Sequence, residues 1–239
     1  MSVYIVSEIC GQWGGSVRKA EQMILQSKMM GADAVKVQLF DTYKLPGEGR
    51  ERWEYLSMKN DDFHRLADYC EKLNIDFFAS AFDRERFGWI KRRRVLNESS
   101  IKVNKIASSL IEIDPDLCKE MIESGMTNFF SLGKWNKPHL PFENSNVVYF
   151  HCLAKYPHTT QEALAVMPAS FEGRVAGYSD HAVGNDAAKE AVRRGAKYVE
   201  KHFTLDKTAQ CSTESAHLCS MDMRDLEDLR RFCDNAVRY

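Results

Sequence analysis

Eight apolar segments of strand length alternate with helical patterns along almost the whole chain of 239 residues. Most of them are continuously apolar, as strands are when a parallel sheet is covered on both faces. Strands that connect through helices run parallel with right-handed crossovers, and eight is the number that closes a barrel. We therefore predict a single α/β domain over residues 1–239, a (β/α)₈ TIM barrel. The predicted strands are 3–9, 34–40, 76–82, 102–108, 128–133, 147–153, 174–180 and 198–205.

One connection departs from this rhythm. The segment 134–146 contains Pro138 and Pro141 and is too short for a full barrel helix, so we expect a reduced fifth helix. An open, doubly wound sheet is the alternative to a closed barrel. For the second helix, Asp61 or Asp62 is the expected N-cap residue. The predicted helices are 16–30, 61–73, 84–93, 115–124, 159–171, 185–195 and 223–238.

Composition excludes several classes of partner. The net charge of −1 gives no bulk attraction to nucleic acid or to an anionic membrane. The basic run 91–94 follows a helical pattern, as a solvated helix end does.

Seven scattered cysteines indicate a reducing compartment with mostly buried thiols. No apolar run reaches the roughly 20 residues of a membrane span, and the chain enters a strand at once without a signal peptide. We expect a cytoplasmic protein.

Two lysines lie inside predicted strands, Lys36 in the second and Lys105 in the fourth. A lysine that points into an apolar barrel without an anion would carry a large desolvation cost. Inward lysines together with nearby hydroxyl groups would form a cationic cup suited to phosphate or carboxylate. Alternatively, both lysines lie on the outer face and reach solvent past the helices. The hydroxyl groups of the expected cup belong to Ser80, Ser108, Ser131 and Ser179.

Two histidines stand at the carboxyl ends of neighbouring predicted strands. His181 follows Asp180 at the end of the seventh strand, and His202 lies in the eighth. A single histidine is more often structural, but two that converge at one sheet edge favour a metal-binding or acid–base role. Neutral imidazole is a good ligand for zinc, manganese or iron, and a bound metal with an open position polarises a carbonyl. Cys10 is either a third ligand or a buried, inert thiol.

An ordered set of motifs resembles the N-acetylneuraminate (sialic acid) synthase family over nearly the whole chain. The motifs are Ser-Glu-Ile-Cys-Gly at 7–11, Gly-Ala-Asp-Ala-Val-Lys-Val-Gln at 31–38, Phe-Ala-Ser-Ala-Phe-Asp at 78–83, Lys-Ile-Ala-Ser at 105–108, Ser-Leu-Gly at 131–133, His-Cys at 151–152, Tyr-Pro at 156–157, Gly-Tyr-Ser-Asp-His at 177–181 and Glu-Lys-His-Phe-Thr-Leu-Asp at 200–206. The resemblance implies a barrel enzyme that condenses phosphoenolpyruvate with a sugar aldehyde and releases phosphate. It also implies a divalent metal, manganese first, with magnesium or zinc as alternatives.

Carried over by position, the resemblance gives each candidate residue a role. His181 and His202 would bind the metal, while Gln38 and Tyr156 would lie near the acceptor aldehyde. The remaining residues, Lys36, Ser80, Lys105, Ser108, Ser131 and Ser179, would hold phosphoenolpyruvate. The two histidines and two lysines are the expected catalytic residues.

The acceptor-binding positions of the family are mostly changed here. Leu110 replaces an acidic residue, Ala154 replaces an asparagine, and only Glu214 stands near the position of the acceptor-binding aspartate. The chain also ends where the family continues into an antifreeze-like domain that contributes an arginine to the partner subunit. We therefore expect an acceptor other than N-acetylmannosamine. A homodimer is expected from the resemblance, with the region between the fifth and sixth strands as a candidate interface.

Two other functions stay open from the sequence. A metal-dependent lyase or aldolase would keep the barrel and the metal but would not use phosphoenolpyruvate. A catalytically silent barrel would bind a ligand or partner, and would be indifferent to loss of either histidine.

Overall fold

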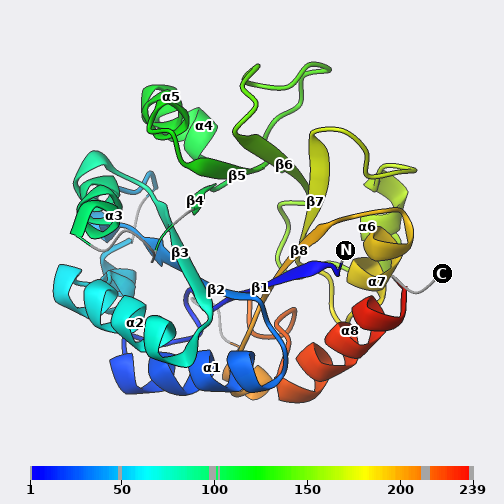
Figure 1. Ribbon diagram of the computed structural model, residues 1–239, viewed down its shortest axis with the longest axis horizontal. Helices are drawn as coiled ribbons and strands as arrows, with labels where there is room; N and C mark the ends of the chain where they lie inside the picture. Colours follow the sequence, from blue (N-terminus) through cyan, green and yellow to red (C-terminus); the bar gives the residue numbers. More distant parts are fainter. Residues whose placement is uncertain (1, 48–49, 97–100, 102, 211–215, 237–239) are drawn as a thin grey trace.

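Eight parallel strands close into one barrel in the computed structural model, which describes residues 2–47, 50–96, 101, 103–210 and 216–236 (Figure 1). Strand β1 pairs with both β2 and β8, so the sheet has no edge and the open-sheet alternative is excluded. The predicted (β/α)₈ fold is confirmed. The strands are β1 (Tyr4–Glu8), β2 (Ala34–Leu39), β3 (Asp76–Ala81), β4 (Val103–Ile106), β5 (Thr127–Ser131), β6 (Val147–Cys152), β7 (Val175–Asp180) and β8 (Tyr198–His202).

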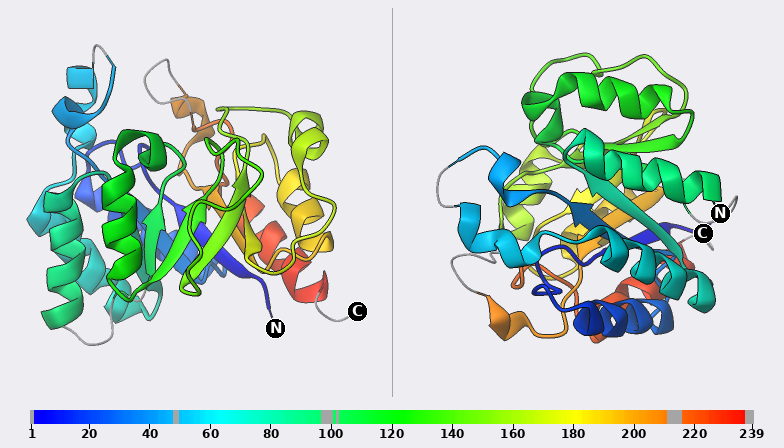
Figure 2. Two further views of the ribbon diagram at one scale, coloured as in Figure 1. Left: turned by 90° about the horizontal axis from the view of Figure 1, so that it is seen from above. Right: turned by 90° about the vertical axis from the view of Figure 1, so that its left-hand side faces the viewer.

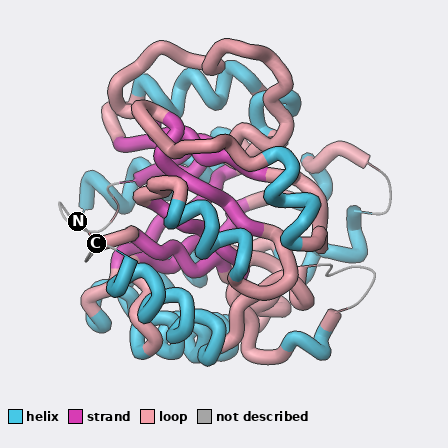
Figure 3. Tube along the Cα trace, turned by 90° about the vertical axis from the view of Figure 1, so that its right-hand side faces the viewer, coloured by secondary structure: helices cyan, strands magenta, loops and turns pink. Residues whose placement is uncertain are grey.

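Helices surround the barrel everywhere except between β5 and β6 (Figures 1 and 3). Residues 132–146 form a loop there, which confirms the reduced fifth helix. The α-helices are α1 (Val17–Met29), α2 (Asn60–Leu73), α3 (Arg84–Leu96), α4 (Leu110–Ile113), α5 (Pro115–Glu123), α6 (Thr160–Val166), α7 (Asp186–Arg193) and α8 (Met223–Ala236). Three short 3₁₀ helices, which the sequence patterns did not indicate, are η1 (Thr42–Lys44), η2 (Arg50–Leu56) and η3 (Lys207–Ala209).

One expectation about helix α2 was wrong, and one about its neighbour α3 is confirmed only for Lys91, Arg92 and Arg94, which are exposed. Helix α2 begins after Lys59, and neither Asp61 nor Asp62 caps it. Both carboxylates lie in the first turn, where they interact favourably with the helix dipole. In the basic run on α3, Arg93 is buried and forms ion pairs with Asp68 at 2.6 Å and with Glu71 at 3.1 Å. The run is therefore not wholly solvated, because one of its members joins α3 to α2.

Alternate residues of each strand point to opposite faces, and this divides the core into two parts. Outward residues such as Val35 and Phe77 pack beneath the helices, where α2 presents Phe63 and Leu66. The inward residues near the middle of the barrel are aromatic. We call this cluster the aromatic plug; it consists of Tyr4, Phe78, Phe129, Phe150 and Tyr198.

Phe129 stands at the centre of the aromatic plug. Its ring centroid lies 5.0 Å from those of both Phe150 and Tyr198, and 5.7 Å from that of Phe78. Gly177 on β7 makes room for this packing, because a Cβ at that position would come within 2.5 Å of the Phe150 ring. The plug fills the barrel below the carboxyl ends of the strands, so polar side chains can collect only above it.

The loops that follow β2 and β8 lie at the end of the barrel opposite to the chain termini (Figure 2). This is the end at which chemistry occurs in (β/α)₈ enzymes. Five of the six described cysteines are buried. Within the described ranges, no helix has the length and apolar character needed to cross a membrane.

Candidate active site

The four residues expected to do the chemistry all point into the barrel. Lys36, Lys105, His181 and His202 are 2%, 1%, 5% and 6% exposed, respectively, which excludes the outer-face alternative for the lysines. They line one cavity above the aromatic plug. The cavity is lined by Glu8, Lys36, Gln38, Lys105, Ala107, Ser108, Ser131, Cys152, Tyr156, Ser179, His181, Glu200 and His202. Of the predicted site residues only Ser80 is not part of this lining.

Strand register brings these side chains together from distant parts of the sequence. Glu8 on β1 is the register partner of Lys36 on β2 and of His202 on β8. Ser80 on β3 likewise pairs with Lys105 on β4. Because residues in register on neighbouring parallel strands point the same way, the barrel itself assembles the site.

Lys36 lies between two carboxylates. Its ammonium contacts Glu8 directly, lies 3.4 Å from Glu200 Oε1, and donates to Ser80 Oγ at 3.3 Å. Burial acts to lower the pKa of Lys36, but Glu200 and Glu8 outweigh it and raise the pKa above its ordinary value. Ser80 does not line the cavity itself, but it accepts a hydrogen bond from Lys36, which does.

Lys105 is the second ammonium group of the cavity. It donates to Ser131 Oγ at 2.7 Å and to Ser179 Oγ at 3.2 Å, and lies 3.1 Å from Glu200 Oε2. Its Nζ also lies 4.4 Å from the centroid of the Phe150 ring, a cation–π contact with the aromatic plug. Burial lowers the pKa of Lys105, although Glu200 opposes that effect.

Glu8 and Glu200 also line the cavity, although neither was among the predicted site residues. Glu8 contacts Lys36, and Glu200 contacts both lysines, so the expected cationic cup also contains two acidic side chains. Burial raises the pKa of Glu8. Burial also opposes ionisation of Glu200, but Lys105 and Lys36 lower its pKa to about 2. The sequence did contain a signal for these two residues. Both lie near the carboxyl ends of predicted strands, at positions whose side chains point to the same side as the lysines.

The two histidines face each other at the mouth of the cavity. Their ring centroids are 5.6 Å apart, and the ring of Tyr156 lies 3.9 Å from that of His181. His181 Nδ1 donates to the Leu153 carbonyl at 3.1 Å, and His202 Nδ1 is 2.9 Å from Gln12 Oε1. Each ring therefore carries its proton on Nδ1 and leaves the Nε2 lone pair available.

Both imidazoles are neutral at physiological pH. Burial lowers the pKa of His181 to about 4, and burial together with His181 and Lys36 lowers that of His202 well below its usual value. Neutral rings held through Nδ1 by an oxygen partner are the usual form of histidine metal ligands. The donor chemistry of this histidine pair therefore fits a divalent metal ion.

A third protein ligand is not evident. Among the residues that the structure describes, no group of three His, Cys, Asp or Glu side chains is arranged to hold a metal. Cys10 does not line the cavity, and its side chain packs against the apolar core instead. Of the two alternatives for Cys10, its position favours a thiol packed against the core, although the residue is only partly buried. Glu214 lies outside the described residues.

The expected acceptor residues lie at the rim. Gln38 Nε2 donates to Glu8 Oε2 at 3.4 Å, and Tyr156 leaves 42% of its surface exposed above the histidines. Ser108 lines the cavity wall next to Ala107. Leu110 is fully buried at the start of α4, so it offers no polar contact at the position where an acidic residue was expected from the resemblance.

The fold and the site define a class: (β/α)₈ barrels with a buried, ion-lined pocket and a neutral histidine pair at the carboxyl ends of the strands. The chain belongs to the NeuB family, whose model matches residues 23–238. The resemblance stated from the motifs is thereby confirmed.

Similar proteins cover nearly all of this chain. It is 29% identical to the N-acetylneuraminate-9-phosphate synthase of Drosophila melanogaster, over 95% of this chain and 66% of that protein. It is 27% identical to the N,N'-diacetyllegionaminic acid synthase of Legionella pneumophila, over 96% and 70%. The crystal structure of N-acetylneuraminic acid synthetase from Leptospira borgpetersenii has the same fold, with a TM-score of 0.82, 24% identity and coverage of 100% and 85%. The chain thus spans about two thirds of the length of these curated relatives.

Proposed function

We propose that this chain is a phosphoenolpyruvate-dependent synthase that condenses phosphoenolpyruvate with a sugar-like aldehyde and releases phosphate. One observation carries the proposal: Lys36 and Lys105 share a single cavity with His181 and His202. Phosphoenolpyruvate carries a carboxylate and a phosphate, the two groups that buried ammonium and hydroxyl donors recognise. Support also comes from the relatives, which bear the names of synthases of sialic-acid-type sugars.

Lys105 and its serine partners form the anchor for the phosphate or carboxylate. Ser131 and Ser179 lie 2.9 Å from each other and both accept hydrogen bonds from Lys105. An arriving anion would take over donors that now contact Glu200, in a pocket whose charged side chains are buried. Because charge pairs are stronger in such surroundings, the anion would be held and oriented by the cavity floor.

The reaction balances with water as the third reactant. The methylene carbon of phosphoenolpyruvate forms a bond to the aldehyde carbon, and the aldehyde oxygen takes a proton and becomes a hydroxyl. Water adds to the neighbouring carbon and loses a proton. The bond from that carbon to the bridging oxygen then breaks, and the new hydroxyl becomes the keto oxygen as its remaining proton passes to the departing phosphate, which gives a 2-keto acid and inorganic phosphate.

Glu8 and Glu200 are the acid–base pair in this proposal. Their surroundings push their pKa values apart, since burial raises that of Glu8 while the lysines lower that of Glu200. Such divergence marks one group as proton donor and the other as acceptor. We assign Glu200 to the proton lost by water and Glu8 to the proton gained by the aldehyde oxygen.

The histidines are the metal site of this proposal. A divalent ion held by His181 and His202 would supply Lewis-acid polarisation of the acceptor carbonyl. Mn²⁺ is our first choice, with Mg²⁺ or Zn²⁺ as alternatives. Gln12 and the Leu153 carbonyl keep the two rings in the tautomer that such an ion requires.

The acceptor in this proposal differs from N-acetylmannosamine. Support comes from Leu110, which is buried, and from Ala154, neither of which provides a polar contact. We also propose a homodimer and a cytoplasmic location, the latter because the seven cysteines are scattered along the chain and five of the six described ones are buried.

The test is phosphate release from phosphoenolpyruvate with Mn²⁺ and a panel of sugar aldehydes, with His202→Ala as the control. We expect release that depends on both the aldehyde and His202, and none above background with N-acetylmannosamine. Rapid turnover of N-acetylmannosamine would refute the acceptor proposal. No release with any aldehyde would favour a lyase or aldolase, and insensitivity of metal binding to both histidines would favour a silent barrel.

A further inference from the structure

A second pair of charges lies on the outside of the barrel, directly behind the histidines. Asp180 and Lys201 are register partners on β7 and β8, and their side chains are 0% and 1% exposed. Because side chains alternate along a strand, this outer ion pair faces away from the cavity, while His181 and His202 are the very next residues along the chain. The reaction proposed above does not use this pair.

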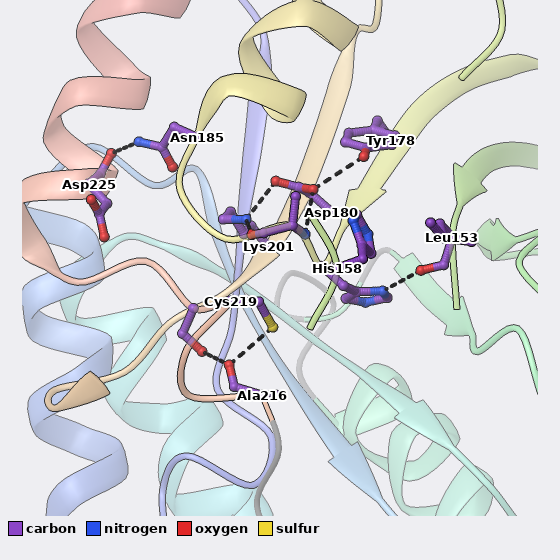
Figure 4. A network of polar contacts seen from close by, with 12 residues as sticks. Leu153, His158, Tyr178, Asp180, Asn185, Lys201, Ala216, Cys219 and Asp225 are labelled. Atoms are coloured by element: carbon purple, nitrogen blue, oxygen red, sulfur yellow. Dashed lines mark hydrogen bonds and ion pairs between the residues drawn. The ribbon is translucent and has the colours of Figure 1, made fainter. Parts of the chain in front are cut away.

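The outer ion pair holds the backbone on both sides of His181. Lys201 Nζ donates to Asp180 Oδ2 and to the Ala182 carbonyl, each at 2.6 Å. Asp180 Oδ1 accepts from the Ala182 amide at 3.0 Å and from the Tyr178 hydroxyl at 3.2 Å. Figure 4 shows Asp180 between Tyr178 and Lys201 in this network. The residues before and after His181 are thus tied to the residue before His202.

The same segment is joined to the loop that carries Tyr156. His158 N donates to the His181 carbonyl at 3.3 Å, and Val183 N donates to the His158 carbonyl at 3.0 Å. A shift of Ala182 would therefore also move the loop that places Tyr156 over the His181 ring. The position of one histidine relative to the other depends on this set of contacts.

Stability alone does not account for such a pair. Desolvation of two buried charges costs about as much as their attraction returns, and neutral replacements of similar size are often as stable. The ion pair supplies a fixed geometry with short, directional hydrogen bonds, which a neutral pair does not supply. We propose that Asp180 and Lys201 are positioning residues that fix the relative placement of His181 and His202. The metal part of this inference rests on the proposed function; the placement of the rings does not.

The experiment replaces the pair with neutral residues of similar volume, Asp180→Asn with Lys201→Met. The matched control is Asp33→Asn with Arg230→Met, which removes a 3.1 Å ion pair at the other end of the barrel. The first measurement is Mn²⁺ affinity, determined by electron paramagnetic resonance at one pH. Because loss of groups that orient metal ligands typically costs about 10- to 100-fold in affinity, we expect that loss in the variant and less than about threefold in the control.

The second measurement needs no metal. Nitrogen-15 NMR of the histidine rings reports which ring nitrogen carries the proton. We expect the parent to show the Nδ1–H form for His181 and the variant to show a mixture of tautomers. Unchanged tautomers and unchanged Mn²⁺ affinity, with the thermal midpoint preserved, would overturn the positioning role. If the parent binds no Mn²⁺, the metal proposal fails and NMR alone decides the positioning role.

A single substitution keeps the test decisive if the double variant does not fold. Lys201→Gln leaves a donor for Asp180 and for the Ala182 carbonyl but removes the positive charge and shortens the reach. The same loss of the Nδ1–H form is expected, of smaller extent. Parent-like histidine spectra in this variant would contradict the proposal.

Discussion

The barrel interior has two halves that are built from the same strands by the same alternation, yet they differ completely in character. The aromatic plug is apolar and packs Phe129 against four neighbouring rings. The half above it, which we call the polar cup, contains Glu8, Lys36, Lys105 and Glu200 with their serine partners. A step of two residues along a strand leads from the plug to the cup, as from Phe129 to Ser131 on β5. In our proposal the plug stabilises the barrel and the cup performs the chemistry.

The plug should account for much of the stability and little of the chemistry. Phe129→Ala removes the central ring, and we expect the free energy of unfolding to fall by about 3–5 kcal/mol. The value of kcat/KM per folded molecule should stay within about threefold of the parent, since no cup residue is changed. Urea unfolding and assays at low temperature check both parts. A large loss of activity in fully folded protein would mean that the two halves are not separable.

The cup should show the opposite behaviour. His202→Ala removes a neutral imidazole at the cavity mouth, and we expect kcat/KM to fall by about 10²- to 10³-fold. The free energy of unfolding should change by less than about 1 kcal/mol, because the ring borders the cavity rather than the plug. Steady-state kinetics of phosphate release and urea unfolding measure the two quantities. A strongly destabilised variant would show that His202 supports the fold in the way that the plug residues do.

The pH dependence of stability should come from the cup as well. The pKa of His181 is about 4 in the fold against an ordinary value of 6.5, so below pH 6.5 the unfolded chain binds a proton that the folded chain does not. The contribution of His181 to the unfolding free energy of metal-free protein should therefore decrease as pH falls from 6.5 towards 4, by up to about 1.4 kcal/mol per unit.

His181→Gln should remove that part of the slope, whereas Phe129→Leu should keep it. Urea titrations at several pH values in the presence of a chelator provide the measurement. Identical slopes for the parent and His181→Gln would show that the histidine is not buried in its neutral form.

Gly177 sits where the two halves meet. Gly177→Ala would place a Cβ within 2.5 Å of the Phe150 ring, which in turn lies beneath Lys105. We expect a destabilisation of about 1–3 kcal/mol from overpacking, together with a modest rise in KM for phosphoenolpyruvate. Thermal unfolding and kinetics detect these effects. An unchanged KM would indicate that the Phe150 ring can move without displacing Lys105.

Much of the fold followed from the sequence because periodicity and length report local structure directly. All eight strands lie within the predicted segments or one residue beyond, and the missing helix was signalled by Pro138 and Pro141. Helix α2 was placed correctly, but its cap was not, because several adjacent polar residues competed for that position.

The site was harder to predict because it depends on register between strands that are distant in sequence. The lysines and histidines stood out by residue type. The contacts that Glu8 and Glu200 make with these lysines, however, required knowledge of which strand ends are neighbours. Gln12 contacts His202 across 190 positions of sequence, a relation that no local pattern encodes.

The central claim is that the buried ammonium groups form the binding site for phosphoenolpyruvate. The most direct measurement is calorimetric titration of phosphoenolpyruvate into the Mn²⁺-loaded parent and into a Lys105→Met, Glu200→Gln variant, which removes one ion pair without changing net charge. We predict binding by the parent and at least about a hundredfold weaker binding by the variant. Equal affinity of the two proteins, or no binding by the folded parent, would contradict the account.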